Sequence, residues 1–364
     1  MSSPTKILSL AATISEATAI VNTYFTTHNL PTPSFEVSGP TRISIPPHEK
    51  EVSKVYAEVL RATMELHHLM LGPTAVLMGI SPVDSLSLNC IYTYKIAHAF
   101  PVDSEATFEH ISDQCGLDLI DTRRILRHAM TNHIFQEIRP GSVTHTAASK
   151  LLATNSLVED FVGIASEERF QAAAHTTQAL QKWGYARAPN QSGFSLGHQT
   201  TNGLYEELRS HPSRGQRWAN AMSVYASKIP LSPLIDSYEW SSLGSATIAG
   251  VGGGYGPVSI GLASQFPLLN FVVQDFEDVV ADGPAAEIGG TGKVVLGGGE
   301  EVKVSFILEL TMDLNMLSYF GSRERSIEDW EGIFTEADER FEVARVVDLE
   351  GGMNCLMEVL WKGE

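Results

Sequence analysis

The sequence is poor in cysteine and has no long apolar runs. Its 364 residues include only three cysteines, Cys90, Cys115 and Cys355, which lie far apart and show no metal-ligand spacing. An odd and sparse set of thiols is typical of a reducing compartment, so we expect a cytoplasmic protein. No apolar run approaches the length that crosses a bilayer, and the N-terminus lacks the apolar core of a signal peptide. We therefore expect no membrane partner.

Positive charge is also scarce. The chain has 25 Lys and Arg against 43 Asp and Glu, which gives a formal net charge of −18. Such a chain repels phosphate backbones, so its composition argues against nucleic-acid binding. A hydrophobic content of 43% and a charged content of 19% are typical of a globular protein. The length allows two structural regions, or one domain with a helical extension.

A glycine cluster is the most informative feature that is present. An apolar, partly β-branched run at 246–251 leads into Gly252, Gly254 and Gly256, and residues 258–266 have helical periodicity. Strand, glycine turn and helix bring a nucleotide-like ligand against bare backbone, because glycine can adopt positive φ. The predicted apolar face of this helix consists of Val258, Leu262 and Phe266.

A second short strand, predicted at 269–273, leads to an acidic residue. Asp275 lies 19 positions after Gly256. This is close to the spacing at which a carboxylate binds the ribose hydroxyls of a nucleotide-like cofactor. The sequence therefore predicts cofactor binding by Gly252, Gly254, Gly256 and Asp275.

The amino-acid sequence of this region is similar to that of a known family. "VGGGYG" followed by "LASQFPLLNFVVQD" resembles the cofactor region of plant- and fungal-type class I O-methyltransferases, which use S-adenosylmethionine. The stretches "GFSLGHQTTNGLYEELRSHPSRGQRWANAM" (193–222) and "DLNMLSYFGSRERSIEDWEGIFTEA" (313–337) also resemble segments of that family. The resemblance begins near Ser85. It implies methyl transfer to an aromatic or polyketide-like small molecule in secondary metabolism.

The resemblance also implies an α/β fold. We expect a Rossmann-like domain at 241–364 with a shortened sheet, a helical connector at 151–240 and a mostly helical region at 1–150.

The region at 1–150 includes a predicted winged helix. Two helices at 107–116 and 121–133 precede a hairpin at 135–145 that turns near Pro140-Gly141. DNA binding would be the direct interpretation of such a module, but the acidic chain argues against it. In the family that the sequence resembles, the module is a dimerisation and substrate-covering element, so we expect a homodimer.

Aromatic and methionine side chains recur at helical spacing in the connector. Trp218, Met222 and Tyr225 lie where the family builds its apolar substrate pocket. Pockets are themselves mostly apolar, so these three residues form either the pocket wall or ordinary core.

The sequence departs from the family pattern at the glycine turn. In the family that the sequence resembles, this strand ends in an acidic residue directly before Val-Gly-Gly-Gly, whereas this chain has Gly250 there. Charge-assisted contacts contribute about 1.5–3 kcal/mol each, so the loss of this acid weakens cofactor binding.

A larger departure follows Val280. Only residues 281–292 precede 293–296, which looks like a late strand of the sheet. The family places two strand–helix units in this interval, roughly 40–60 residues at about 30 per unit. The missing part would carry the histidine that acts as general base in the family. No histidine in this chain follows His211, which precedes the glycine turn.

If methyl transfer survives, another residue must supply the base. His198 lies in the segment that approaches the pocket, and Glu324 matches the acid that orients the base in the family. The alternatives are a solvated loop histidine and a surface ion pair of Glu324 with Arg323 or Arg325.

Three functions remain open at this point: an O-methyltransferase, a methyltransferase-like pericyclase or cyclase, and a catalytically inactive partner of the same fold. Cyclisation needs shape and hydrogen bonding more than a base.

Overall fold

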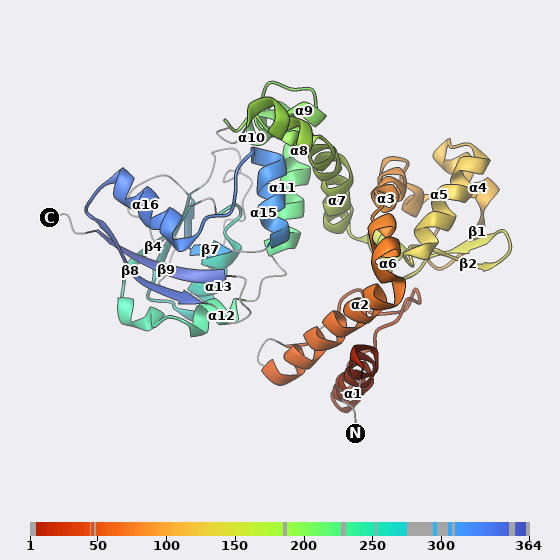
Figure 1. Cartoon of the computed structure of the whole chain (residues 1–364), viewed down its shortest axis with the longest axis horizontal. Helices are drawn as coiled ribbons and strands as arrows, with labels where there is room; N and C mark the ends of the chain where they lie inside the picture. The colour runs from red at the N-terminus through yellow and green to blue at the C-terminus, as the bar shows by residue number, and fades with distance from the viewer. Residues whose placement is uncertain are drawn as a thin grey trace. The chain divides into compact units, whose positions relative to one another are not determined.

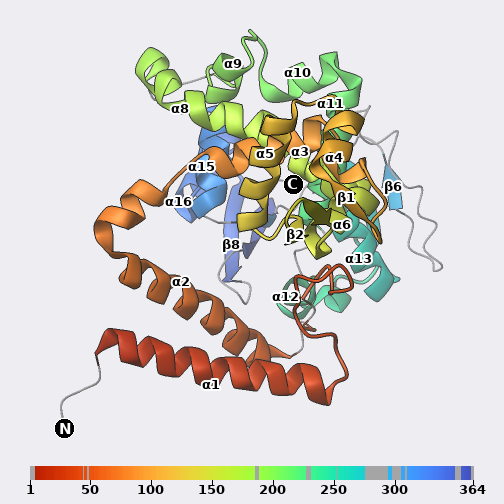
Figure 2. The same cartoon turned by 90° about the vertical axis from the view of Figure 1, so that its right-hand side faces the viewer.

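The computed structural model describes residues 5–43, 45–46, 49–184, 188–226, 231–251, 253–274, 294–296, 305–307, 310–348 and 354–361. The chain divides into two compact units, Met1–Ser166 and Glu167–Glu364. Both units are mostly helical, and each has small sheets (Figures 1 and 2).

The first unit begins with two long helices that pack against each other. Within α2, Gly72 has a φ of 73° and is followed by Pro73. A proline inside a helix lacks the amide hydrogen and clashes with the preceding turn, so α2 is kinked here. The helices of this unit are α1 (Lys6–Thr27), α2 (Lys50–Gly79), α3 (Val83–Thr93), η1 (Ile96–His98), α4 (Phe108–Cys115), α5 (Leu119–Thr131), α6 (Ala147–Thr154) and α7 (Ser156–Ile164).

The predicted order of two helices and a hairpin is confirmed in this unit. Helices α4 and α5 precede β2 (Gln136–Arg139) and β3 (Ser142–Thr144), with Gly141 at a φ of 85° in the turn. Strand β1 (Glu105–Thr107) completes an antiparallel sheet of order β1-β3-β2.

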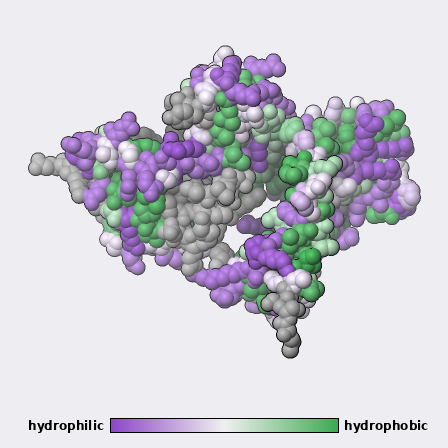
Figure 3. All heavy atoms as spheres, viewed as in Figure 1, coloured by the Kyte–Doolittle hydropathy of each residue, from purple (hydrophilic) through white to green (hydrophobic). Residues whose placement is uncertain are grey.

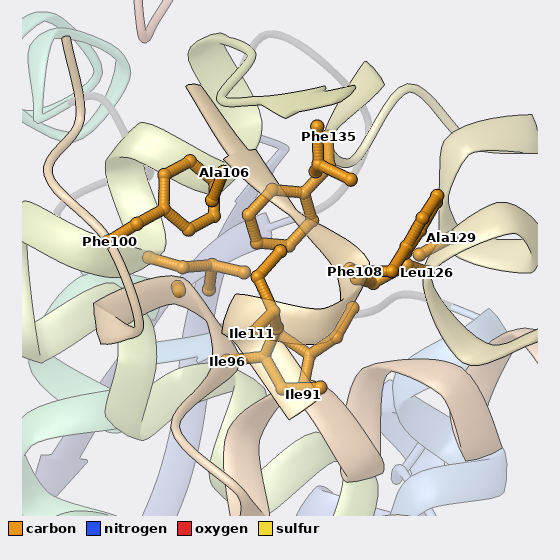
Figure 4. Close-up of a cluster of buried hydrophobic side chains, with 12 residues drawn as sticks. Ile91, Ile96, Phe100, Ala106, Phe108, Ile111, Leu126, Ala129 and Phe135 are labelled. Carbon is orange, nitrogen blue, oxygen red and sulfur yellow. The ribbon is translucent and has the colours of Figure 1, made fainter. Parts of the chain in front are cut away.

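The core of the first unit joins these helices to the sheet (Figure 4). Its buried members are Ile91, Ile96, Ala97, Phe100, Ala106, Phe108, Ile111, Leu126, Ala129, Phe135, Val143 and Leu152.

The second unit begins with helices that cover the predicted connector from residue 167 onward, whereas residues 151–166 belong to the first unit. One turn of π-helix, Ala165–Arg169, precedes α8. Helix α15 packs against both α8 and α9, although more than 100 residues separate them in the sequence. The helices of this unit are α8 (Phe170–Trp183), α9 (Gly193–Gly197), α10 (Leu204–Ser210), α11 (Pro212–Ala226), α12 (Ser232–Asp236), η3 (Trp240–Leu243), α13 (Pro257–Gln265), α15 (Leu310–Phe320) and α16 (Ile327–Ala337).

Two three-stranded sheets follow. Strands β4 (Thr247–Val251), β5 (Asn270–Gln274) and β6 (Val294–Leu296) form a parallel sheet in that order. Residues 294–296, within the segment where the sequence predicts a late strand, form a strand that pairs directly with β5, with Phe271 opposite Val294. Strands β7 (Ser305–Ile307), β9 (Asn354–Trp361) and β8 (Phe341–Asp348) form an antiparallel sheet in the order β7-β9-β8.

The predicted apolar face of α13 is confirmed at Leu262 and Phe266, which pack in the core of the second unit, and is wrong at Val258. Val258 is 46% exposed, whereas Ser259, Leu262 and Ala263 are buried. The hydroxyl of Ser259 faces Gly250, whose lack of a side chain leaves room for a small polar residue. Because the buried Ser259 is polar, the hydrophobic residues alone assigned Val258 to the buried face in its place.

No single helix within the described ranges has the length and apolar character needed to span a bilayer. Helices α2 and α3 meet these two criteria only as a pair bent by 62°.

Candidate functional site

The predicted glycine turn connects β4 to α13 (Figure 1). Gly254 and Gly256 have φ values of 54° and 76°, so the positive φ expected for these glycines is confirmed. A Cβ atom on Gly256 would come 2.9 Å from Cγ2 of Val273, so a side chain does not fit there. A Cβ atom on Gly254 would meet no heavy atom within 4 Å. The space that a Cβ atom at Gly254 would take is therefore empty.

The backbone of the glycine turn can accommodate a nucleotide-like cofactor. The open side of Gly254 lies directly before α13, whose first amide groups have no partner within the helix. At Gly250, however, no carboxylate is present, and a Cβ atom would lie 3.1 Å from Oγ of Ser259. The other two predicted cofactor ligands, Gly252 and Asp275, lie outside the described residues.

Helix α11 connects the glycine turn to the predicted pocket residues. The side-chain amide of Gln216 donates a hydrogen bond to the Tyr255 hydroxyl at 3.3 Å. On the same helix, Trp218 is 9% exposed and its ring lies edge-on to that of Tyr319 in α15, with 5.2 Å between centroids. The remaining predicted pocket residues, Met222 and Tyr225, are half-buried on α11.

His198 follows the last turn of α9 and is half-buried. Its Nδ1 lies 3.1 Å from the carbonyl oxygen of Phe194, and the two rings stack with 4.2 Å between centroids. Because a carbonyl only accepts, Nδ1 carries the proton and Nε2 keeps its lone pair.

The surroundings of His198 favour the neutral imidazole. Burial lowers its pKa below the ordinary value of 6.5, and the charge of Arg214 lowers it further, whereas Glu168 and Glu207 oppose the shift. At neutral pH the imidazole can therefore accept a proton at Nε2.

Glu324 lies in the segment between α15 and α16. Its backbone amide donates to Oδ1 of Asp313 at 2.6 Å. Burial and the charge of Asp313 raise the pKa of the Glu324 carboxyl, and Arg325 opposes the rise.

The two arginines that were alternatives for pairing with Glu324 have other contacts. Arg323 pairs with Asp329 at 2.6 Å, and the Arg325 guanidinium lies 5.1 Å from the centre of the Trp330 ring. Across the described parts of the chain, Glu324 forms no ion pair with either arginine, and no hydrogen bond or ion pair joins it to His198.

Sequence reasoning missed a buried carboxylate near His198. Glu168 lies in the π-helical turn and is 0% exposed. Its Oε1 accepts hydrogen bonds from Nε of Arg214 at 3.2 Å and from the guanidinium of Arg217 at 2.6 Å. The two arginines lie three positions apart on α11 and therefore share a face, a spacing that could have indicated an acidic partner.

A second carboxylate extends this network. Glu207 of α10 accepts from Thr200 at 2.7 Å, from Asn202 at 3.0 Å and from Arg214 at 3.4 Å. Arg214 thus connects two acidic side chains, and all charges in the cluster are paired, as burial requires.

Comparison with known proteins identifies the family, although no family model matches the chain. The O-methyltransferase pyvH of Aspergillus violaceofuscus (strain CBS 115571) is 30% identical over 426 residues, which cover 98% of this chain and 99% of that protein. This chain belongs to the O-methyltransferase family. A grayanic acid biosynthesis cluster O-methyltransferase of Cladonia grayi is 30% identical over 422 residues, covering 99% of this chain and 88% of that protein. The predicted membership in the S-adenosylmethionine-dependent O-methyltransferases is confirmed.

Solved structures confirm the Rossmann-like methyltransferase fold. OxaC in complex with SAH and oxaline has a TM-score of 0.70 at 16% identity and covers 98% of this chain and all of that chain. A structure described as a pericyclic reaction enzyme has a TM-score of 0.69 at 14% identity, covering 96% of this chain and all of that chain. At these identities the likeness concerns the fold alone.

The family members are longer within the aligned region. The alignment with the Aspergillus protein runs over 426 positions and exceeds the length of this chain, 364 residues, by 62. At least that many residues of the relative therefore face gaps in this chain.

Proposed function

We propose that this protein transfers a methyl group from S-adenosylmethionine to a hydroxyl of an aromatic or polyketide-like small molecule in secondary metabolism. The observation that carries the proposal is the 30% identity to O-methyltransferases over nearly the whole chain. The glycine turn supports it, because the space on the side-chain side of Gly254 is empty just before the start of α13. The sparse cysteines support a cytoplasmic location.

Different residues of this chain would bind the cofactor, accept the proton and line the acceptor pocket. Backbone at Gly252, Gly254 and Gly256, together with Asp275, would hold S-adenosylmethionine, which when bound supplies an electrophilic methyl group. His198 is the base: its Nε2 accepts the hydroxyl proton of the acceptor, and a deprotonated oxygen is the stronger nucleophile. Trp218, Met222 and Tyr225 form the apolar wall of the acceptor pocket.

Product analysis tests this function directly. The purified chain would be incubated with methyl-labelled S-adenosylmethionine and a panel of phenols and aromatic polyketides, and labelled products would be separated by chromatography and mass spectrometry. Methyl transfer predicts labelled products that form only when both cofactor and protein are present. Cofactor binding without any labelled product across the panel would contradict the proposal.

A second candidate function is cyclisation of a polyketide-like substrate without methyl transfer. It is favoured by Gly250, which stands where an acid would bind the cofactor, and by the lack of any histidine after His211. The same product analysis distinguishes the two, because a cyclase would convert its substrate without incorporating label. An inactive partner protein would bind neither cofactor nor substrate.

The length difference from the relatives supports a shortened catalytic domain. We place the missing residues after Val280, where the sequence has a short glycine-rich connection in place of two strand–helix units.

We also infer that the first unit contains a winged helix and forms a homodimer. The helix–helix–hairpin order of α4, α5, β2 and β3 supports the module. Apolar side chains near the end of α2 support association, because they are too exposed for an isolated unit. Figure 3 shows hydrophobic residues gathered over the α2–α3 segment, which includes Met70, Leu77, Met78, Ile80 and Leu86, between 52% and 80% exposed.

A further inference from the structure

Two side chains of the loop between α9 and α10, residues 198–203, donate hydrogen bonds to one carboxylate. The hydroxyl of Thr200 and the side-chain amide of Asn202 donate to the same oxygen, Oε2, of Glu207, at 2.7 and 3.0 Å. Glu207 is 8% exposed. A buried carboxylate from α10 therefore accepts hydrogen bonds from two polar side chains of the loop that begins at His198.

The loop needs these hydrogen bonds because its backbone is strained. Gln199, directly after His198, has a φ of 53°, a left-handed conformation that side chains other than glycine adopt at a cost. Other hydrogen bonds also support the loop, among them those from the Thr200 amide to the Ser195 carbonyl at 3.1 Å, from the Ser195 hydroxyl to the Asn202 carbonyl at 2.9 Å and from the Asn190 side-chain amide to the Thr201 carbonyl at 2.9 Å. Their partners Ser195 and Asn190 precede the loop, so these three bonds do not anchor it to α10 or α11.

The other oxygen of Glu207 connects the loop to the helix that contacts the glycine turn. Oε1 lies 3.4 Å from the Arg214 guanidinium and 3.4 Å from Nδ1 of His211. Arg214 in turn donates to Glu168 at 3.2 Å. Two positions further along α11, Gln216 bonds Tyr255 of the turn. Glu207 is thus the link between the loop of His198 and α11.

We propose that Glu207 is a positioning residue that holds the loop at 198–203 and so keeps the His198 imidazole in its half-buried place against Phe194. Its importance for catalysis rests on the proposed role of His198 as the base. The geometric role is independent of that assignment. When the hydrogen bonds to Glu207 are lost, the loop opens and water reaches the His198 imidazole.

Loss of Glu207 affects the pKa of His198 in two opposite directions. Removing the negative charge alone lowers this pKa, because Glu207 stabilises the imidazolium, as Glu168 also does and Arg214 opposes. Releasing the loop hydrates the imidazole and raises the pKa toward its ordinary value of 6.5. A rise of the His198 pKa on loss of Glu207 therefore indicates that Glu207 positions the loop, whereas a fall indicates that it acts only through its charge.

The experiment is an NMR titration of the His198 imidazole in the full chain, with its signal assigned from the spectrum of His198→Gln. Two variants of Glu207 are compared. Glu207→Gln removes the charge but keeps an oxygen that accepts from Thr200 and Asn202, whereas Glu207→Met has similar length and no such acceptor. We expect the pKa to stay lowered in wild type and Glu207→Gln, and to rise toward 6.5 in Glu207→Met. Equal pKa values in the two variants would overturn the proposal.

Thr200→Val covers the case in which Glu207→Met fails to fold. It keeps the charge of Glu207 and the side-chain volume but removes one of the two donors to Glu207, so we expect a smaller shift in the same upward direction. An unchanged pKa in Thr200→Val together with an unfolded Glu207→Met would also overturn the proposal. The titration needs neither cofactor nor acceptor, so it is decided independently of whether the protein transfers methyl groups.

Discussion

The hydroxyl oxygen of Ser259 lies 3.1 Å from the position that a Cβ atom on Gly250 would take. A side chain at 250 would thus project toward α13 and meet a hydroxyl that can rotate and donate to it. The site has lost an acidic residue, and a Cβ atom there would crowd the Ser259 hydroxyl, which would have to shift by a few tenths of an ångström to accept a carboxylate. Cofactor affinity should respond to restoration of the acid.

We expect Gly250→Asp to bind S-adenosylmethionine about tenfold more tightly or better, because a charge-assisted contact with the cofactor's ammonium contributes about 1.5–3 kcal/mol. Isothermal titration calorimetry measures the change. Gly250→Asn is the matched control, since it has nearly the same size and no charge. Equal affinities for the Asp and Asn variants would show that no positive group of the cofactor lies there.

Gly254→Val is expected to abolish binding of S-adenosylmethionine, because its side chain would occupy the open space beside the turn. The positive φ adds a strain of about 1–2 kcal/mol, which must be separated from the effect on binding. Gly244→Val is the control, since Gly244 also has a positive φ of 63° and open space around it. Both variants should lose similar stability in thermal unfolding. If Gly254→Val kept wild-type affinity, the turn would not be the cofactor site.

These predictions rest on features that the sequence showed well. Glycine spacing and flanking apolar runs are local, so they predicted the β4–turn–α13–β5 order and the positive φ of Gly254 and Gly256. The network of Glu168 with Arg214 was missed, because it joins residues 46 positions apart and depends on how α11 packs. Val258 was wrongly assigned to the buried face of α13 because it is apolar, whereas the structure buries the polar Ser259 beside Gly250.

Association of the first unit should depend on its exposed apolar side chains. We expect light scattering at micromolar concentration to give the mass of a dimer, and Met78→Glu with Ile80→Glu to give a monomer, because a charge is costly to bury at an interface. These side chains are 80% and 79% exposed. Leu268→Glu, at a 67% exposed position of the second unit, should leave the mass unchanged. A monomeric wild type would refute the dimer.

His145 should make the stability of the first unit depend on pH. It is 1% exposed, and its ring centroid lies 4.4 Å from that of Phe100. Burial lowers its pKa below 6.5, so the folded state favours the neutral form. The resulting stabilisation is fully present above pH 6.5 and is lost as the pH falls through the folded-state pKa.

Urea unfolding between pH 7.5 and pH 5 measures this dependence. We expect the unfolding midpoint to fall on acidification, and to fall less steeply in His145→Gln. His110→Gln, at an exposed position of α4, should keep the wild-type slope. A His145→Gln variant with an unchanged slope would assign the dependence to other groups.

Catalysis should depend on His198 more than on Glu324. The imidazole has its proton fixed on Nδ1 by the Phe194 carbonyl and a pKa lowered by burial, so Nε2 is available as a base at neutral pH. Loss of a general base lowers turnover by about 10²–10⁴-fold, and we expect this for His198→Gln. Because no hydrogen bond or ion pair joins Glu324 to His198 in the described structure, Glu324→Gln should change kcat much less.

The chain offers a close control for the histidine. His28 at the end of α1 makes the same local contacts as His198, with Nδ1 at 2.9 Å from the Tyr24 carbonyl and 4.1 Å between the ring centroids. His28→Gln removes an equivalent contact in the other unit and should leave kcat unchanged. Turnover by His198→Gln at the wild-type rate would assign the base elsewhere. If wild type itself shows no turnover, but a chain with a histidine-bearing insertion after Val280 does, the base belongs to the segment that the relatives have and this chain lacks.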